Sequence, residues 1–431
     1  MMRHTPRGFA GATGADHMAN RPGIFPTFFL SGFECSTFCW KEGQRRNLIA
    51  ETQHDSHAHE DYQILNRLGI AVAREGVPWP MVDNGDGFDF SCLDRMLEAM
   101  AAAKIVPIWD LCHYGYPDRF DPFSEDFADQ FARYCRAAAE YLIPRTRGPH
   151  FFTPINEISF FACCGGEWSW VAPYRSKRDD RERLREVLCK AAIAGVKAIR
   201  EVDPAARMIH IDPLVHVVAQ RDRPDLIEAA HHETYVDTFL GWDILCGKSL
   251  PEYGGTPEIL DIIGANNYSF GQMEYREEGP HAALEPGDDR IVPLCELMSR
   301  VWERYRLPMI IAETSGLGKG RADWLRDVTE EALAAVERGM DLQAICLFPA
   351  VDMPDWHTGE WLHNGIYDLV ERNGVLERVA HQPVIDELRR WQKEFKRVTV
   401  LDDDPFSDPV DLQDVVDAAK RLKKLPDANW H

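Results

Sequence analysis

Two glutamates carry the clearest chemical signal in this sequence, because each follows a short apolar segment. The segment 151–155 is followed by Asn156 and Glu157, and the segment 309–312 is followed by Glu313. A single glutamate in such a place is more often a solvated carboxylate than a catalytic one. Two carboxyl groups over one cavity, however, can hydrolyse a glycosidic bond. They stand about 5–5.5 Å apart when the anomeric configuration is retained and about 6.5–9.5 Å apart when it is inverted.

The elements that would position these glutamates follow one repeated pattern. Short apolar segments of strand length alternate with amphipathic segments of helix length, which is typical of βα units with parallel strands. The eight predicted strands are 27–32, 70–74, 105–109, 150–155, 207–212, 260–265, 308–312 and 344–348. Eight such units favour closure into a barrel, and no Gly-x-Gly-x-x-Gly motif follows the first strand. We therefore predict an α/β protein with a (β/α)₈ TIM barrel as a single domain.

One predicted helix shows how the pattern is interpreted. After residue 126, apolar residues recur at steps of three and four, namely Phe127, Phe131, Tyr134, Ala138 and Tyr141. Ser124, Glu125 and Asp126 precede them, so we expect Ser124 to cap this helix.

The chain length suits one barrel with extensions. Its 431 residues lie within the range of a single TIM barrel. Residues 1–23 are predicted to be a loose tail, and they lack the hydrophobic segment of a secretory signal. Residues 24–396 are expected to form the barrel. Residues 397–431 are expected to form a C-terminal extension with a helix at 412–422.

The net charge and the distribution of apolar residues limit the kinds of molecule that the protein can be expected to bind. Lys and Arg number 48 and Asp and Glu number 70, which leaves a net charge of −22. This charge argues against a nucleic acid or an anionic membrane as partner. No segment approaches the roughly 20 apolar residues of a spanning helix. The eleven cysteines show no paired spacing, so we expect a reducing, cytoplasmic setting. Whether the chain forms a homo-oligomer stays open.

The barrel prediction has a consequence for the two glutamates. Active sites of such barrels lie at the C-terminal ends of the strands. Glu157 would end the fourth strand and Glu313 the seventh, and these strands lie on opposite sides of the ring. We therefore expect the two side chains to face each other across the mouth.

Motifs in the same order resemble glycoside hydrolase family 1, the β-glucosidase-like retaining enzymes of clan A. The resemblance runs from about Phe28 to Phe395. The motifs that carry it are 59–62 with 68–69, 74–80, 112–117, 153–157, 263–268, 311–316 and 348–359.

The resemblance implies a role for each residue of the site. Glu157 would be the acid/base and Glu313 the nucleophile. Arg74 would keep Glu313 charged, and that charge would raise the pKa of Glu157. Asn156 would donate to the sugar 2-hydroxyl, and Tyr268 would lie near the nucleophile. Their alternatives are structural: Tyr268, for example, could simply pack the barrel rim.

The same resemblance implies substrate contacts. His113 and Asp355 would bind hydroxyls of the glycone, the sugar unit whose bond is cleaved. Trp356 would stack on the sugar ring, although a tryptophan can equally belong to the core. Trp168 and Trp170 are candidates for a platform under the aglycone, the leaving part of the substrate.

Several departures from the family pattern predict a changed glycone. Cys39 or Trp40 stands where the family has a glutamine that binds the glycone. Asp355 replaces a glutamate, Phe348 a tryptophan, and Ile158 the proline after the acid/base. A changed set of hydrogen-bonding groups implies a changed sugar.

We therefore predict a retaining β-glycosidase that acts on a small glycoside and needs neither cofactor nor metal. One alternative is a catalytically inactive barrel that binds a carbohydrate or a protein. A cellulase-like clan A enzyme is a lesser one. His54, His57 and His59 could also gather a metal ion, although a polar loop before the first helix is the simpler interpretation.

Overall fold

A closed barrel of eight parallel strands forms the centre of the molecule. The computed structural model describes residues 23–40 and 43–398. The strands follow one another around the barrel in chain order: β1 (Phe29–Gly32), β2 (Val72–Gly76), β3 (Val106–Asp110), β4 (Phe151–Thr153), β5 (Arg207–Pro213), β7 (Ile262–Asn266), β10 (Met309–Thr314) and β11 (Leu342–Leu347). β1 pairs with both β2 and β11 and so closes the ring. The predicted (β/α)₈ TIM barrel is confirmed, and each predicted strand overlaps an observed one.

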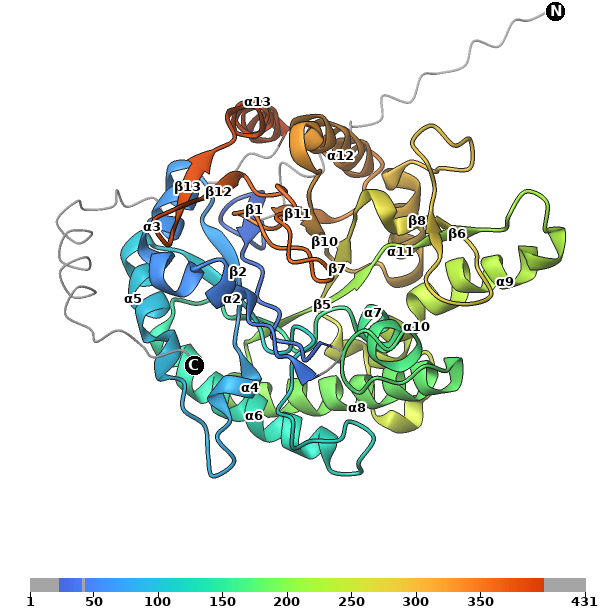
Figure 1. The fold of residues 1–431 in the computed structure, drawn as a ribbon, viewed down its shortest axis with the longest axis horizontal. Helices are drawn as coiled ribbons and strands as arrows, with labels where there is room; N and C mark the ends of the chain where they lie inside the picture. The colour runs from blue at the N-terminus through green and yellow to red at the C-terminus, as the bar shows by residue number, and fades with distance from the viewer. Residues whose placement is uncertain (1–22, 41–42, 399–431) are drawn as a thin grey trace, which may run out of the picture.

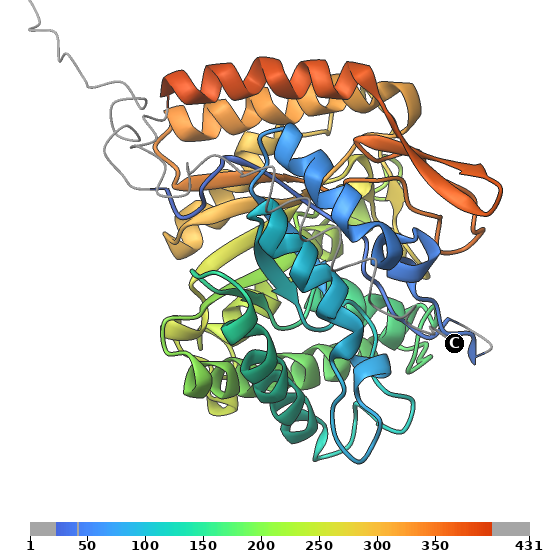
Figure 2. The ribbon, with the colours of Figure 1, turned by 90° about the vertical axis from the view of Figure 1, so that its left-hand side faces the viewer.

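Helices surround the strands (Figure 1). They are α2 (Leu48–Glu51), α3 (His54–Arg67), α4 (Trp79–Val82), α5 (Asp94–Ala103), α6 (Phe127–Leu142), α7 (Ile158–Ala162), α8 (Arg178–Val202), α9 (Ile227–His232), α10 (Thr238–Leu245), α11 (Leu294–Tyr305), α12 (Arg321–Glu337) and α13 (Gln382–Val398). Figure 2 shows α12 and α13 side by side along one flank of the barrel. Within the described residues, no helix combines the length and apolarity that crossing a bilayer requires.

Two small sheets were not anticipated. The hairpin of β12 (Tyr367–Arg372) and β13 (Val375–Ala380) is antiparallel, and β6 (His216–Val218), β8 (Gln272–Glu274) and β9 (Ala282–Ala283) form a three-stranded sheet. Asn373 and Gly374 connect the hairpin with φ values of 55° and 81°. An Asn-Gly pair at positive φ is typical of the tight turns that match the twist of a hairpin.

Apolar side chains form two layers, one inside the barrel and one between the barrel and the surrounding helices. Alternate strand residues such as Val72, Ile108 and Ile310 point into the barrel, and their neighbours pack outward against the helices. Arg74 and Asp110 are each two positions beyond an inward residue, so the alternation of a strand turns them inward at the C-terminal end of the barrel.

The predicted helix after residue 126 is α6. Phe127, Phe131, Tyr134 and Ala138 are buried as expected, and Tyr141 is half-buried. The predicted cap is wrong: Ser124 donates to the carbonyl of Asp121, and α6 begins without a side-chain cap. The hydroxyl closes a turn of the preceding loop instead.

The predicted terminal segments fall almost wholly outside the described residues. This applies to the tail at 1–23, of which only Gly23 is described, and to the extension at 397–431 with its expected helix at 412–422. α13 itself continues to Val398.

Candidate active site

A buried ion pair lies at the mouth of the barrel. Arg74 Nη1 donates to Glu313 Oε1 over 2.6 Å, and Nη2 donates to Asp110 Oδ2 over 2.8 Å. The same Nη2 lies 3.1 Å from Asn156 Oδ1. Arg74 and Glu313 are 1% and 4% exposed. A buried guanidinium that never deprotonates favours the charged form of the carboxylates around it.

A β-bulge turns Glu313 toward this arginine. In β10, Ile310 and Ala312 point into the barrel, so strict alternation would send residue 313 outward. The pairing of β10 with β7 and β11 shifts register after Ile311. Thr314 then points outward, where its hydroxyl accepts a hydrogen bond of 2.8 Å from Trp324 Nε1 of α12. The bulge re-aims the side chain, as bulges at barrel rims commonly do.

Tyr268 holds the other oxygen of Glu313. Its hydroxyl donates to Glu313 Oε2 over 2.9 Å, and the residue lies two positions after the end of β7. Each oxygen of Glu313 therefore has a donor of its own, which holds the plane of the carboxylate in one orientation.

Glu157 adopts a strained backbone conformation. Its φ of 45° and ψ of 61° lie in the left-handed region, which a residue with a side chain rarely adopts. Its N–H donates to the carbonyl of Ile211 over 3.0 Å, and its own carbonyl accepts from Phe161 of α7. Such strain often marks a functional position.

Two neutral donors bind the carboxyl group of Glu157. Asn266 Nδ2 donates to Oε1 over 2.8 Å, and the hydroxyl of Tyr114 donates to Oε2. Burial raises the pKa of Glu157 to about 8, and the negative charge of Glu313 adds to this effect. The bonds from Tyr114 and Asn266 act in the opposite direction but do not outweigh it.

His113 belongs to the same buried network. Its Nδ1 lies 3.0 Å from Asp110 Oδ2, and its Nε2 lies 3.3 Å from Asn156 Nδ2. Burial favours the neutral ring, but the neighbouring Cys35, Glu34 and Asp110 outweigh it and raise the pKa of His113 well above its usual value.

Aromatic rings form one wall of the mouth. The Trp356 ring lies 5.1 Å from that of Tyr114, centroid to centroid. Its Nε1 is buried and has no hydrogen-bond partner among the described residues. Trp168 and Trp170 lie 4.8 Å apart, and Trp170 reaches His357 at 4.6 Å. Trp170 therefore contacts the residue that follows Trp356, whereas Trp168 packs on Trp170 and Phe160.

Asp355 lies outside this network. Its Oδ1 accepts hydrogen bonds from the N–H groups of His357 and Thr358 and from the Thr358 hydroxyl. Although burial opposes it, these bonds lower the pKa of Asp355. The structure therefore brings together nine of the ten expected site residues and places Asp355 in a local turn.

The positions that depart from the family pattern have structural roles. Cys39 is buried, and its carbonyl accepts from Ala172 N over 3.0 Å. The Trp40 ring meets His357 at 4.7 Å. Phe348 lies beneath Arg74, whose guanidinium carbon is 5.0 Å from the ring centroid. Neither Cys39 nor Trp40 supplies a side-chain amide.

Four residues of the network were not expected: Tyr114, Asn266, Asp110 and Glu34. Tyr114 and Asn266 lie inside motifs that carried the resemblance, so their proximity in sequence to His113 and Tyr268 was a signal. Inward alternation in β3 could have identified Asp110. Glu34 follows β1 and had no such signal.

Groups that could ligate a metal already have other partners. His54 contacts Asp61 and Glu75, whereas His57 and His59 contact Gln53 and Gln63 of their own helical segment, so the three rings do not converge. Two other clusters bring ligand atoms within 4.8 Å of one another, Cys35 with Asp110 and His113, and Asp352 with His363 and Asp368. Arg74 pairs with the first and Arg321 with the second, so an arginine already supplies the positive charge.

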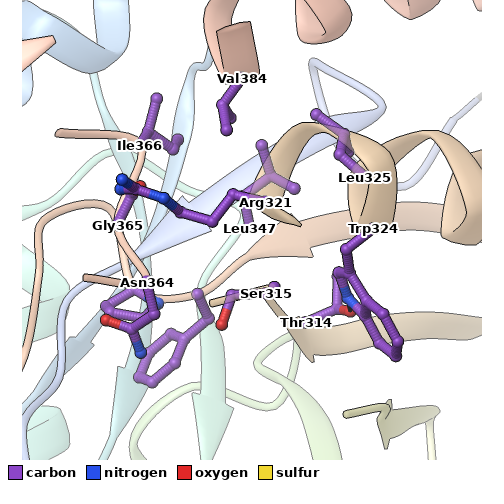
Figure 3. A pocket seen from close by; sticks show the side chains of 13 residues that line it. Thr314, Ser315, Arg321, Trp324, Leu325, Leu347, Asn364, Gly365, Ile366 and Val384 are labelled. Carbon is purple, nitrogen blue, oxygen red and sulfur yellow. Dashed lines mark hydrogen bonds between the residues drawn. The ribbon is translucent and has the colours of Figure 1, made fainter. Parts of the chain in front are cut away.

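A small cavity lies behind β10, away from the two glutamates. Figure 3 shows Thr314 and Ser315 at the end of this strand, Arg321 and Trp324 from α12, and Val384 from α13 around it. Neither Glu157 nor Glu313 lines this cavity.

Comparison with known proteins points to one group. No protein-family profile matches the chain. A β-glucosidase A of Thermotoga maritima is 21% identical over 360 residues, which cover 71% of this chain and 79% of that protein. An aryl-phospho-β-D-glucosidase of Bacillus subtilis is 22% identical over 387 residues, with coverage of 71% and 79%.

Solved structures agree with this at the level of the fold. The β-glucosidase from Thermotoga maritima in complex with glucoimidazole superposes with a TM-score of 0.70 at 17% identity, over 88% of this chain and 99% of that one. The same enzyme in complex with deoxynojirimycin also has a TM-score of 0.70. A further match is described as a family 1 β-glucosidase. The expected resemblance to glycoside hydrolase family 1 is confirmed.

Proposed function

We propose that the protein is a glycoside hydrolase, a divergent relative of the family 1 β-glucosidases that cleaves a small β-glycoside with retention of configuration. One observation carries the proposal: two buried carboxyl groups at the ends of β4 and β10 have opposite environments. Glu313 is paired with a cation, and the pKa of Glu157 is raised to about 8. A buried carboxyl group that holds its proton can act as an acid, and a carboxylate beside a cation can act as a nucleophile.

In the first step, Glu313 attacks the anomeric carbon. Its charge is held by Arg74 and its orientation by Tyr268. Glu157, protonated at neutral pH, donates its proton to the leaving oxygen as the glycosidic bond breaks. The products are a glycosyl ester on Glu313 and the free aglycone.

In the second step, Glu157 takes a proton from a water molecule that attacks the same carbon. The ester bond breaks, Glu313 leaves as a carboxylate, and Glu157 is again protonated. Two inversions at one carbon give net retention. In this mechanism Asn156, which contacts Arg74 and Tyr114, donates to the sugar 2-hydroxyl.

Replacement of the nucleophile tests this function. We expect Glu313→Gly to lower kcat on 4-nitrophenyl β-glycosides by more than about a thousandfold, because the covalent step is lost. Added azide should restore turnover by entering the vacant space and should give a glycosyl azide of inverted configuration. Glu330→Ala removes an exposed carboxylate of α12 and serves as the matched control.

The stereochemistry of the product gives a second readout. We expect the wild-type enzyme to release the β-anomer first, as followed by proton NMR. Initial release of the α-anomer would contradict the double displacement. Sugar binding without hydrolysis of any glycoside would instead favour a binding protein, the alternative that the altered residues Cys39 and Phe348 suggest.

A further inference from the structure

The mouth of the barrel holds a third buried carboxylate that the mechanism does not use. Glu34 follows β1 and is 4% exposed. The N–H of Ser36 donates to its Oε1 over 3.1 Å, and the Ser36 hydroxyl donates to the same atom. The other oxygen, Oε2, accepts no hydrogen bond from any residue that the structure describes. Oε2 is not fully enclosed, so this oxygen can accept a hydrogen bond from a ligand.

Polar groups lead from the catalytic pair to Glu34. Asn156 Nδ2 lies 3.3 Å from His113 Nε2, and His113 Nε2 lies 3.9 Å from Glu34 Oε1. In the proposed function Asn156 binds the hydroxyl next to the anomeric carbon. A sugar whose 2-hydroxyl binds Asn156 would then direct its more remote hydroxyls toward His113 and Glu34.

The charge of Glu34 interacts with the charged groups of the site, namely His113 and Glu313. Burial raises the pKa of Glu34, the nearby His113 opposes this effect, and Glu313 adds to it. Glu34 also contributes to the raised pKa of Tyr268, which contacts the nucleophile. Glu34 therefore lies close enough to His113, Tyr268 and Glu313 for their charges to interact.

We propose that Glu34 determines glycone specificity by accepting hydrogen bonds from the sugar hydroxyls remote from the anomeric carbon. The proposal rests on the proposed function. It also accounts for the missing amide at Cys39, because a carboxylate five residues earlier supplies the acceptor. Hydrogen bonds to a charged acceptor are about twice as strong as neutral ones.

The charge of Glu34 also selects the class of sugar. A phosphorylated glycone would need an unpaired cation, yet Arg74 is already bound to Asp110 and Glu313. Arg46, the next arginine in the field of Glu34, is bound to Glu51. Among the described residues around Glu34, no arginine is left unpaired for a phosphate, so we expect a glycoside without phosphate on the sugar, unlike the substrate class named for the aryl-phospho-β-D-glucosidase.

Paired changes in enzyme and substrate test the proposal. The substrate is the 4-nitrophenyl β-glycoside that the wild type cleaves fastest among the glucoside, galactoside, fucoside and xyloside, compared with its 3-deoxy and 4-deoxy analogues. We expect Glu34→Gln to lower kcat/KM for the parent about ten- to a hundredfold, mainly through KM. For at least one deoxy analogue, Glu34→Gln should lower kcat/KM less than threefold, because that analogue lacks the hydroxyl that binds Glu34. Equal losses on parent and both analogues would overturn the proposal.

Controls separate a specific effect from a general one. Asp261→Asn removes a carboxylate at the opposite end of the barrel, where it binds Arg200. We expect this variant to keep KM within twofold. If Glu34→Gln does not fold, the test uses the wild-type enzyme alone. Its kcat/KM should be at least tenfold lower for one deoxy analogue than for the parent glycoside. A smaller decrease for both analogues contradicts the role of Glu34.

Two outcomes distinguish this proposal from the proposed function. Hydrolysis of none of the glycosides would overturn the function, and the role of Glu34 would then be judged by calorimetry with deoxynojirimycin. Binding at least tenfold weaker in Glu34→Gln supports the role, whereas equal binding or none in the wild type overturns it. Faster cleavage of the 6-phosphorylated glycoside than of its parent would overturn the assigned class of sugar.

Discussion

At the residue scale, the site shows how two identical side chains acquire different chemistry. Both glutamates are buried, but only Glu313 has a cation, Arg74, as direct partner. Glu157 has the neutral donors Tyr114 and Asn266 and a negative neighbour. Desolvation therefore favours the protonated form of Glu157, whereas Glu313 lies in a direct ion pair with Arg74.

The raised pKa of Glu157 predicts the alkaline limit of activity. Because the acid must be protonated, we expect kcat/KM to fall about tenfold per pH unit above pH 8. The bond from Tyr114 stabilises the charged form, so Tyr114→Phe should move this limit to higher pH. Rate profiles between pH 5 and 10 measure the shift.

A neighbouring tyrosine provides the control for this profile. Tyr116→Phe removes a buried hydroxyl that does not bind Glu157, so its alkaline limit should match the wild type. A limit that moves to lower pH in Tyr114→Phe would contradict the assignment of Glu157 as the acid.

At the element scale, helix packing overrides helix propensity at one position. Gly195 lies in α8 against α6, where an added Cβ would come within 2.8 Å of Cys135 Sγ and 2.9 Å of a Phe131 ring carbon. Propensity alone predicts that Gly195→Ala stabilises the helix by about 1 kcal/mol. Overpacking a core usually costs about 1–3 kcal/mol.

We expect packing to dominate, so Gly195→Ala should lower the free energy of unfolding by about 1–2 kcal/mol. Urea denaturation followed by circular dichroism measures it. The smaller side chain of Phe131→Leu should reduce the cost of Gly195→Ala when the two are combined. An unchanged cost in the double variant would show that Phe131 is not the obstacle.

At the scale of the whole molecule, a buried network ties the last hairpin to the first helices. Arg378 of β13 binds Asp61 of α3 through bonds of 2.8 and 3.0 Å. His54 lies 2.8 Å from the same carboxylate and 3.2 Å from Glu75 of β2. Burial favours neutral His54, but these two carboxylates outweigh it and raise the pKa of His54 to about 9.

This raised pKa predicts how stability depends on pH. The charged ring stabilises the folded state fully below pH 6.5, and the contribution is lost as pH rises through 9. We expect the wild type to lose on the order of 1–3 kcal/mol across this range. His54→Gln should lack this loss, as measured by urea denaturation at pH 6, 7.5 and 9.5. Parallel pH dependences of the two proteins would contradict the prediction.

The sequence by itself determined the order and approximate ends of the eight strands and the buried face of α6. Both follow from the spacing of apolar residues, which reports burial within one element. The sequence also contains the Asn-Gly turn of the hairpin β12–β13. The hairpin was not predicted, because it lies beyond the eighth strand of the βα pattern. The cap at Ser124 was wrong because a hydroxyl near a helix start has competing local acceptors.

Only the tertiary structure decided which polar side chains meet. Barrel closure places Arg74 beside Glu313, although the two residues lie 239 positions apart in the sequence. A shift of register in β10 turns Glu313 inward and Thr314 outward, against simple alternation. Spacing did not identify Glu34, and it gave no sign of the local turn that engages Asp355 Oδ1. The physical reason is that strand register and loop closure bring together groups from different elements, whereas sequence periodicity describes one element at a time.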